Sequence, residues 1–163
     1  MGHAEPTSAG ICVHDPGESG NTFSLEIEAI AHDDSRKNFR TGRTFEVENN
    51  YSRAVRIGDV IYVAGTTSII PDEVVQHPGD VGPQVDDTLA IIRDAVEQLG
   101  GAWADLVRTR TYVVGGLPAL DVASARLKAN LVGTESAATL MGVPVLGRLE
   151  VVVEIEATAV LER

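Results

Sequence analysis

Two glutamates stand close together near the C-terminus, inside an otherwise apolar run. Glu154 and Glu156 are two residues apart in "LEVVVEIEATAVL" (149–161), which alternates as a β-strand does, so their side chains share one face. A glutamate in a half-buried position has a raised pKa, which suits it to proton transfer near neutral pH. The same glutamate could instead pair with an arginine or face solvent, and the pattern leaves these interpretations open.

Other residues capable of chemistry are sparse. Cys12 is the one cysteine, so neither an intrachain disulfide nor a cysteine-only zinc site can form. His3, His14 and His32 are spread without the spacing of metal ligands, and His77 lies in the polar segment "VQHPGD". We therefore expect no metal site.

The charge balance limits the class of partner. The chain has 24 acidic against 13 basic residues, a net charge of −11, and no basic run. A nucleic-acid-binding protein needs a cationic surface, so DNA and RNA are disfavoured as partners, and a ribonuclease is the weakest hypothesis. A local arginine cluster could still hold one small anion.

Composition indicates a globular, cytoplasmic protein. The apolar fraction is 44% over 163 residues, which is enough for a hydrophobic core. No stretch reaches the roughly 18–20 apolar residues of a membrane span. The N-terminus lacks the basic-then-apolar layout of a signal peptide, so we expect no membrane association.

Hydrophobic periodicity predicts the elements that would position the glutamates. The clearest helix has an apolar stripe of Val85, Leu89, Ile92, Val96 and Leu99, followed by Gly100 and Gly101. A Gly-Asp turn at 58–59 predicts a hairpin between the first two strands of the compact part. We expect helices at 83–99 and 118–131, loop at 71–80, and strands at 51–59, 60–68, 105–115, 137–143 and 149–161.

This β-β-α-β-α-β-β order predicts an α+β fold. Each helix bridges two strands, so both helices can cover one face of a mixed sheet. The last strand is apolar on one side and mixed on the other, with Glu154 and Glu156 on the mixed side. A half-polar open face indicates an oligomer that packs sheet against sheet.

The N-terminal part differs in character. Residues 1–22 have no periodicity and are expected to be a tail, 23–31 alternate as a strand, and 32–43 form a polar linker. The chain would then divide into an extension, 1–43, and a compact domain, 44–163. "LEIEAIAHD" (25–33) also repeats much of "VEIEATAVL" (153–161).

Three segments together resemble a known family. "YSRAVRIGDVIYVAGTTS", "QVDDTLAIIRDAVEQLGGAWADLVRTRTYV" and "VVVEIEATAV" match, in order and spacing, the Rid family of reactive-intermediate deaminases, also called YjgF-like or UK-one-fourteen-like proteins. The resemblance covers roughly 44–161. It implies a chorismate-mutase-like fold and a homotrimer with a central barrel and ligand clefts between subunits. It also implies hydrolysis of imines or enamines to ammonia and a 2-keto acid without metal or cofactor.

The site residues that the family implies can be carried over one by one. The tyrosine at the mouth of the cleft corresponds to Tyr51 and the glycine before the loop to Gly65. The glutamate that positions water corresponds to Glu154, and the backbone amide that binds substrate to Leu140. The arginine that holds the substrate carboxylate should lie two residues before Leu140, where this chain has Ala138 in "SAAT".

The missing arginine changes the expected function. Losing the partner of a buried carboxylate costs several kcal/mol, on the order of 3–5. Arg108, Arg110 or Arg148 could replace it, and we favour Arg148 and Arg110. We expect a deaminase-like hydrolase (EC 3.5.-) with atypical specificity, in which Glu154 and Tyr51 transfer protons or add water to an imine, enamine or related carbonyl compound. The alternative is a trimer that binds or senses a small ligand without catalysis.

The resemblance also suggests an origin for the repeat. In the family the "VEIEATAV" type of strand closes a domain. A similar strand near 23–31, followed by a linker and a domain start, is therefore interpreted as the remnant of a preceding tandem Rid-like domain.

Overall fold

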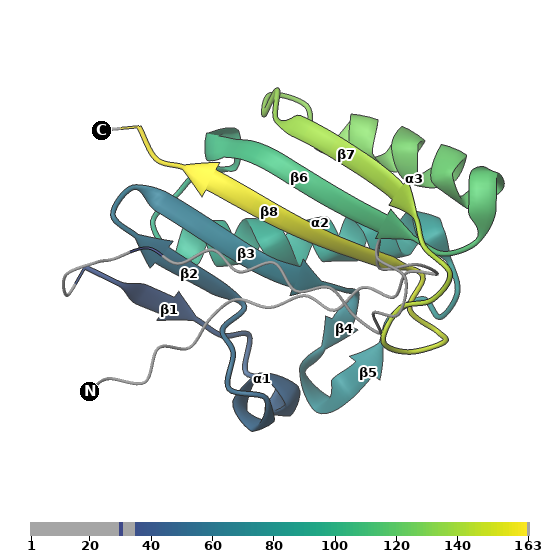
Figure 1. Cartoon of the computed structure of the whole chain (residues 1–163), viewed down its shortest axis with the longest axis horizontal. Helices are drawn as coiled ribbons and strands as arrows, with labels where there is room; N and C mark the ends of the chain where they lie inside the picture. Colours follow the sequence, from purple (N-terminus) through teal and green to yellow (C-terminus); the bar gives the residue numbers. More distant parts are fainter. Residues whose placement is uncertain (1–29, 31–34, 163) are drawn as a thin grey trace, which may run out of the picture.

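One six-stranded mixed sheet organises the molecule (Figure 1). The computed structural model describes residue 30 and residues 35–162. The strands lie in the order β1-β2-β3-β8-β6-β7, and among these neighbours β6 and β7 are parallel while the others are antiparallel. Their bounds are β1 Lys37–Phe39, β2 Ala54–Ile57, β3 Val60–Thr66, β6 Leu106–Val113, β7 Ala137–Gly142 and β8 Val153–Val160.

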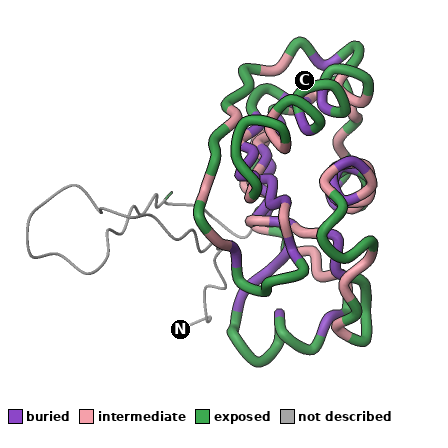
Figure 2. The backbone as a smooth tube through the Cα atoms, turned by 90° about the vertical axis from the view of Figure 1, so that its right-hand side faces the viewer, coloured by how far each residue is buried: buried purple, intermediate pink, exposed green. Residues whose placement is uncertain are grey.

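Two long helices cover one face of this sheet. α2 (Val81–Gln98) packs against β3 and β8, and α3 (Gly116–Asn130) packs against β6 and β7. The apolar stripe of α2 is buried as its spacing predicts, and it meets the inward residues of β8, Val153 and Ile155, in the main core. Figure 2 shows the buried segments gathered where the sheet faces α2. The expected α+β class is confirmed, and from β2 onward the strands of the main sheet and the two long helices follow the expected β-β-α-β-α-β-β order, with β4 and β5 as an additional small hairpin between β3 and α2.

The hairpin between β2 and β3 forms at the expected turn. Ile57 pairs with Val60, so Gly58 and Asp59 make the connection. Gly58 has a φ of 59°, in the left-handed region where glycine is favoured because it has no Cβ. The hairpin places Tyr51 and Arg53 just before β2 and Gly65 near the end of β3.

Several short elements lie in or directly beside the segments where the sequence predicted a linker or a loop. β1 extends the sheet within the expected linker 32–43, and α1 (Thr44–Glu48) follows it. β4 (Ile69–Ile70), just before the expected loop 71–80, pairs with β5 (Val74–Val75) inside it, and the two form a small hairpin around the turn η1 (Pro71–Glu73). Such elements span too few residues for a hydrophobic pattern to repeat, so tertiary contacts rather than sequence periodicity define them.

A second, smaller core fixes the loop that leads into β8. Ile69, Tyr112, Leu146 and Val151 are buried together, which joins the small hairpin to the 143–152 segment. The buried Gln84 side chain of α2 strengthens this contact: its Nε2 donates to the Glu150 carbonyl at 2.8 Å, and its Oε1 accepts from Val152 N at 2.9 Å. The start of β8 is therefore held in place from both sides.

The strand expected at 23–31 lies outside the described residues, apart from Ile30, which is assigned to no strand. The tandem-domain origin of the extension stays a prediction. Within residues 35–162, none of the helices combines the length and the hydrophobicity needed to cross a bilayer.

We predict that truncating a valine of β8 destabilises the protein only where that valine is buried. Val153 is fully buried, whereas Val160 on the same strand is 41% exposed. Val153→Ala should lower the free energy of unfolding by about 2 kcal/mol, since it removes buried methyl groups and leaves a cavity. Val160→Ala, the control, should change it by less than about 0.5 kcal/mol. Equal losses in chemical denaturation would contradict the assignment of β8 to the core.

Candidate active site

A cavity of about 470 Å³ opens between α1, the ends of β2 and β3, and the start of β8. Four of the residues that line it belong to the acidic and basic types: Arg43, Arg53, Arg148 and Glu154. The cavity thus joins segments that are far apart in the sequence. The remaining lining residues are Phe45, Asn49, Tyr51, Gly65, Thr67, Ile69, Gly147 and Val151.

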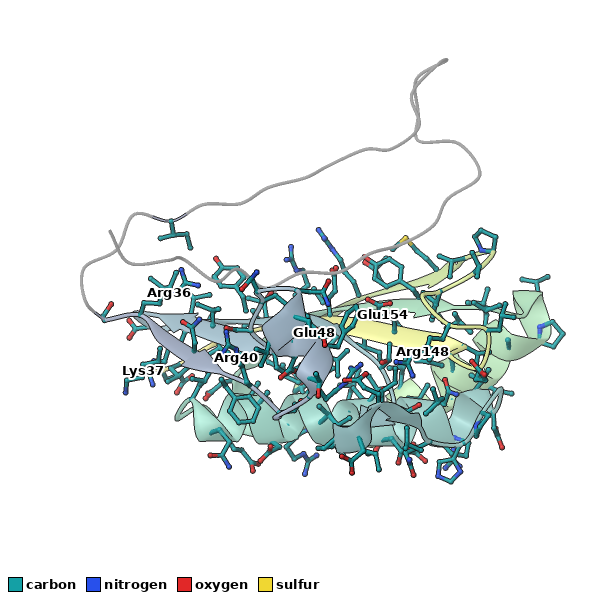
Figure 3. All side chains as sticks on the ribbon, turned by 90° about the horizontal axis from the view of Figure 1, so that it is seen from below. Arg36, Lys37, Arg40, Glu48, Arg148 and Glu154 are labelled. Carbon is teal, nitrogen blue, oxygen red and sulfur yellow. The ribbon has the colours of Figure 1, made fainter. Side chains whose placement is uncertain are left out.

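Glu154 lines this cavity and has a strongly raised pKa. Its side chain, on β8 opposite Tyr112, is only 7% exposed. Burial, followed by the nearby Glu156 carboxylate, raises the pKa of Glu154 to about 7, although the Arg53 guanidinium acts in the opposite direction. Glu154 is therefore able to give or take a proton at neutral pH. Figure 3 labels Glu154 on β8 and Arg148 in the loop that precedes it.

Tyr51 is held by a buried arginine. The Nη2 group of Arg53 donates to the Tyr51 hydroxyl oxygen at 2.9 Å, and Arg53 is only 2% exposed. Its Nη1 group donates to the Gly65 carbonyl at 2.6 Å, and its Nε to Glu46 Oε1 at 3.0 Å. The ring of Phe45 packs edge-on against Tyr51, with centroids 6.2 Å apart. Tyr51 is thus fixed on both sides.

A second cluster of charges lies beside the cavity. Glu73 Oε2 lies 2.6 Å from Arg43 Nη2 and 3.2 Å from Arg148 Nη2. The hydrogen bonds from Arg43 hold the pKa of Glu73 below its usual range, with further contributions from Phe45 N–H and Arg148. Glu73 and Asp72 both have positive φ, 60° and 73°, a strained backbone for residues other than glycine. Two guanidiniums share one carboxylate here, so the cluster keeps a net positive charge.

The cavity brings together some of the residues that the sequence predicted. Tyr51, Gly65, Arg148 and Glu154 all line it. Gly65 contributes its carbonyl, which accepts from Arg53. Arg148 also donates from Nη1 to the Glu73 carbonyl at 2.7 Å, so part of its hydrogen-bonding capacity is already used.

Arg110 lies outside this cavity. Its Nη1 is 3.6 Å from Glu156 Oε2, and the Tyr112 hydroxyl donates to the same oxygen at 3.4 Å. Burial, together with the Glu156 charge, raises the pKa of Tyr112. Arg110 therefore neutralises Glu156, the neighbour of Glu154 on the mixed face of the sheet.

Ala138 and Leu140 also lie elsewhere in the single chain. Both are on β7, the edge strand, and β6 separates them from β8. A cleft shared with a second subunit would be needed to bring them to the cavity, and their roles stay predictions.

Sequence reasoning missed Arg43, Arg53, Glu46 and Glu73. Arg53 had a usable signal: it stands two residues after Tyr51 next to a strand, so alternation places both side chains on one side. Arg43 and Glu73 had none, because they come from irregular segments that meet only through folding. Among residues 35–162, no group of three or more His, Cys, Asp or Glu side chains could hold a metal ion.

Comparison with known proteins agrees with this architecture. Residues 41–161 match the model of the family described as Endoribonuclease L-PSP. Rv2704 from Mycobacterium tuberculosis, a member of the YjgF/YER057c/UK114 family, is 33% identical, with a TM-score of 0.69 over 78% of this chain and 100% of its own. YyfB from Yersinia pestis, of the Rid protein family, is 30% identical, with a TM-score of 0.59 over 78% of this chain and 99% of its own.

The YjgF gene product of E. coli is 25% identical, with a TM-score of 0.63 over 77% of this chain and 94% of its own. A search of the curated proteins found no significant match.

We predict that Glu154 makes stability pH-dependent. Its pKa rises from the usual 4.5 to about 7 on folding, so the folded chain binds a proton more tightly than the unfolded chain. Its contribution is therefore fully present below about pH 4.5 and is lost as the pH rises through about 7. The full difference is about 3 kcal/mol at most.

The variant Glu154→Gln removes this titration. Relative to the wild type, it should gain stability between about pH 5 and pH 8 in denaturant unfolding followed across pH. A constant difference between the two proteins over that range would show that Glu154 titrates normally.

Proposed function

Because this chain belongs to the Endoribonuclease L-PSP family, which includes the YjgF and Rid proteins, we propose that it is a small-molecule enzyme that hydrolyses an imine, an enamine or a related carbonyl compound. The observation that carries the proposal is Glu154, a carboxyl with a pKa of about 7 on the wall of a cavity that Tyr51 also lines. A general acid-base group works best when its pKa lies near the operating pH.

The chemistry needs only proton transfers and water. An enamine gains a proton on carbon and becomes an iminium ion, and water then adds to the C=N carbon and loses a proton to give a carbinolamine. The carbinolamine nitrogen gains a proton and leaves as ammonia, while the hydroxyl group loses its proton and becomes a C=O group. Neutral Glu154 would supply the first proton, and its carboxylate would take a proton from the attacking water. Tyr51 would donate a hydrogen bond to a nitrogen or oxygen of the ligand. One water is consumed for each ammonia released.

Arg148 is our candidate for the anchor of the substrate. It lines the cavity with Arg43, and the two share the single carboxylate of Glu73, which supports an anion-binding role. Arg110 is less suited, because Glu156 already pairs with it. With Ala138 in place of an arginine, the usual imino acids should be poor substrates.

We further propose that the working unit is a homotrimer. The face of the sheet away from α2 and α3 carries Arg110 and Glu156 as well as the partly exposed Val107 and Met141. A second copy packed on this face would shield it, and because β7 is an edge strand of the sheet, the same copy could approach Ala138 and Leu140 at that edge.

A binding or regulatory role is the alternative, and Ala138 is the observation that favours it. A trimer without the arginine could hold a ligand without turning it over. A ribonuclease role is disfavoured, because a net charge of −11 opposes binding of a polyanion.

We predict that ammonia release depends on Glu154. With 2-aminoacrylate generated in situ, Glu154→Gln should lower the rate above the spontaneous background by about 100-fold or more, since an amide cannot exchange the proton. Glu97→Gln, at an exposed position on α2, is the matched control and should react as the wild type does. Wild-type rates in Glu154→Gln would contradict the proposed mechanism, whereas ligand binding without turnover by the wild type would favour the regulatory alternative.

We also predict that Ala138 limits turnover of ordinary imino acids. The wild type should hydrolyse 2-iminopropionate more slowly than an arginine-bearing relative, and Ala138→Arg should raise the rate by about 10-fold or more, since a guanidinium binds a carboxylate bidentately. Ala129→Arg, at an exposed position on α3, is the control and should have no such effect. A wild-type rate equal to that of the relative would contradict this interpretation of Ala138.

A further inference from the structure

We infer that Arg53 is a positioning residue that couples Tyr51 to Glu154: its donated hydrogen bond turns the Tyr51 proton toward the cavity, and its charge lies within electrostatic reach of Glu154. The inference rests on the proposed function of this cavity and adds a residue to it. Arg53 is not expected to react itself.

The burial of Arg53 does not by itself indicate a gain in stability. Arg53 is 2% exposed and its partner Glu46 is fully buried. Glu46 is itself held by Thr41, whose N–H and hydroxyl each donate at 2.9 Å. Removing two charges from water costs free energy that their attraction often fails to recover, and apolar residues of similar volume commonly do as well. A buried ion pair beside a cavity therefore points to a role for the charge.

The hydrogen bonds of Arg53 fix the direction of the Tyr51 proton. A guanidinium has N–H donors and no acceptor, so in the 2.9 Å contact with Nη2 the Tyr51 oxygen must accept. The phenolic hydrogen takes no part in that bond and is left to point elsewhere. Tyr51 lines the cavity, and its hydrogen is the group it can offer to a ligand there. The ligand atom at Tyr51 should be an acceptor, such as a carbonyl oxygen or an imine nitrogen.

Arg53 itself cannot turn away. Its Nη1 donates to the Gly65 carbonyl and, at 3.1 Å, to the Thr66 hydroxyl oxygen. The Thr66 hydroxyl in turn donates to the Ala64 carbonyl at 2.7 Å, so its oxygen is free to accept from Arg53. The guanidinium is thus pinned to the end of β3 on one side and to Glu46 on the other.

The charge of Arg53 also acts on Glu154. It lowers the pKa of Glu154, against burial and the Glu156 carboxylate, which both raise it. Without Arg53 the carboxyl would remain protonated further above neutral pH. Arg53 therefore directs the hydroxyl proton of Tyr51, and it also keeps the pKa of Glu154 low enough for the Glu154 proton to exchange near neutral pH.

The test compares Arg53→Met and Arg53→Lys with the wild type by two measurements. The first is a ¹³C NMR titration of the Glu154 carboxyl, whose resonance is identified by its absence in Glu154→Gln. The second is ammonia release from 2-aminoacrylate, also in Tyr51→Phe. Arg56→Met is the matched control, because Arg56 donates to the Gly58 and Leu99 carbonyls and does not line the cavity.

Arg53→Met should raise the pKa of Glu154 by about 1 unit or more, since it removes a neighbouring positive charge. Arg53→Lys keeps the charge but not the planar fork, so the Glu154 titration should stay near that of the wild type while ammonia release falls about as far as in Tyr51→Phe. Arg56→Met should change neither.

An unchanged Glu154 titration in folded Arg53→Met would overturn the inference, as would full activity of Arg53→Lys. If Arg53→Met does not fold, Arg53→Lys alone tests the inference: its Glu154 titration should match that of the wild type while its rate of ammonia release falls. If the wild type releases no ammonia above background, the proposed function fails, and the Glu154 titration in the Arg53 variants still tests the inference.

Discussion

A guanidinium that is almost completely removed from water must satisfy its charge and its N–H groups inside the protein, and much of the site follows from how Arg53 does so. Glu46 neutralises it and thereby ties α1 to the sheet. The Gly65 carbonyl accepts from it and fixes the end of β3, and the Tyr51 oxygen accepts from it and fixes the aromatic ring. The contacts that satisfy one buried charge therefore also position several walls of the cavity.

The local charge of this region differs from that of the whole chain. The net charge is −11, yet Arg43, Arg53 and Arg148 all line the cavity. Glu46 neutralises Arg53, whereas the carboxylate of Glu73 is divided between Arg43 and Arg148. An acidic protein thereby keeps a cationic group at the cavity while its surface charge repels polyanions. Proton uptake by Glu154 near neutral pH makes the charge of the cavity more positive, because it removes a negative charge from the same wall.

Much of the fold could be predicted from the sequence, and the reasons are specific. The stripe of α2 and the alternation of β8 are long enough to show their period, and the Gly58-Asp59 turn has a local preference of its own. β1, α1 and the β4–β5 hairpin are too short to show one. Glu154 and Tyr51 were found through resemblance to a family, whereas Arg43 and Glu73 approach each other only because α1 and η1 pack together. The perturbed acidity of Glu154 depends on burial by distant segments, which periodicity does not describe.

The central claim is that Arg53, Tyr51 and Glu154 form one proton-directing unit. Neutron diffraction on deuterium-exchanged crystals tests it most directly, because it locates the hydrogens themselves. At about pH 6, below the Glu154 pKa of about 7, we expect deuterium on the Glu154 carboxyl, deuterium of Arg53 Nη2 directed at the Tyr51 oxygen, and the Tyr51 deuterium directed into the cavity. An ionised Glu154 at that pH, or a Tyr51 deuterium directed away from the cavity, would contradict the account.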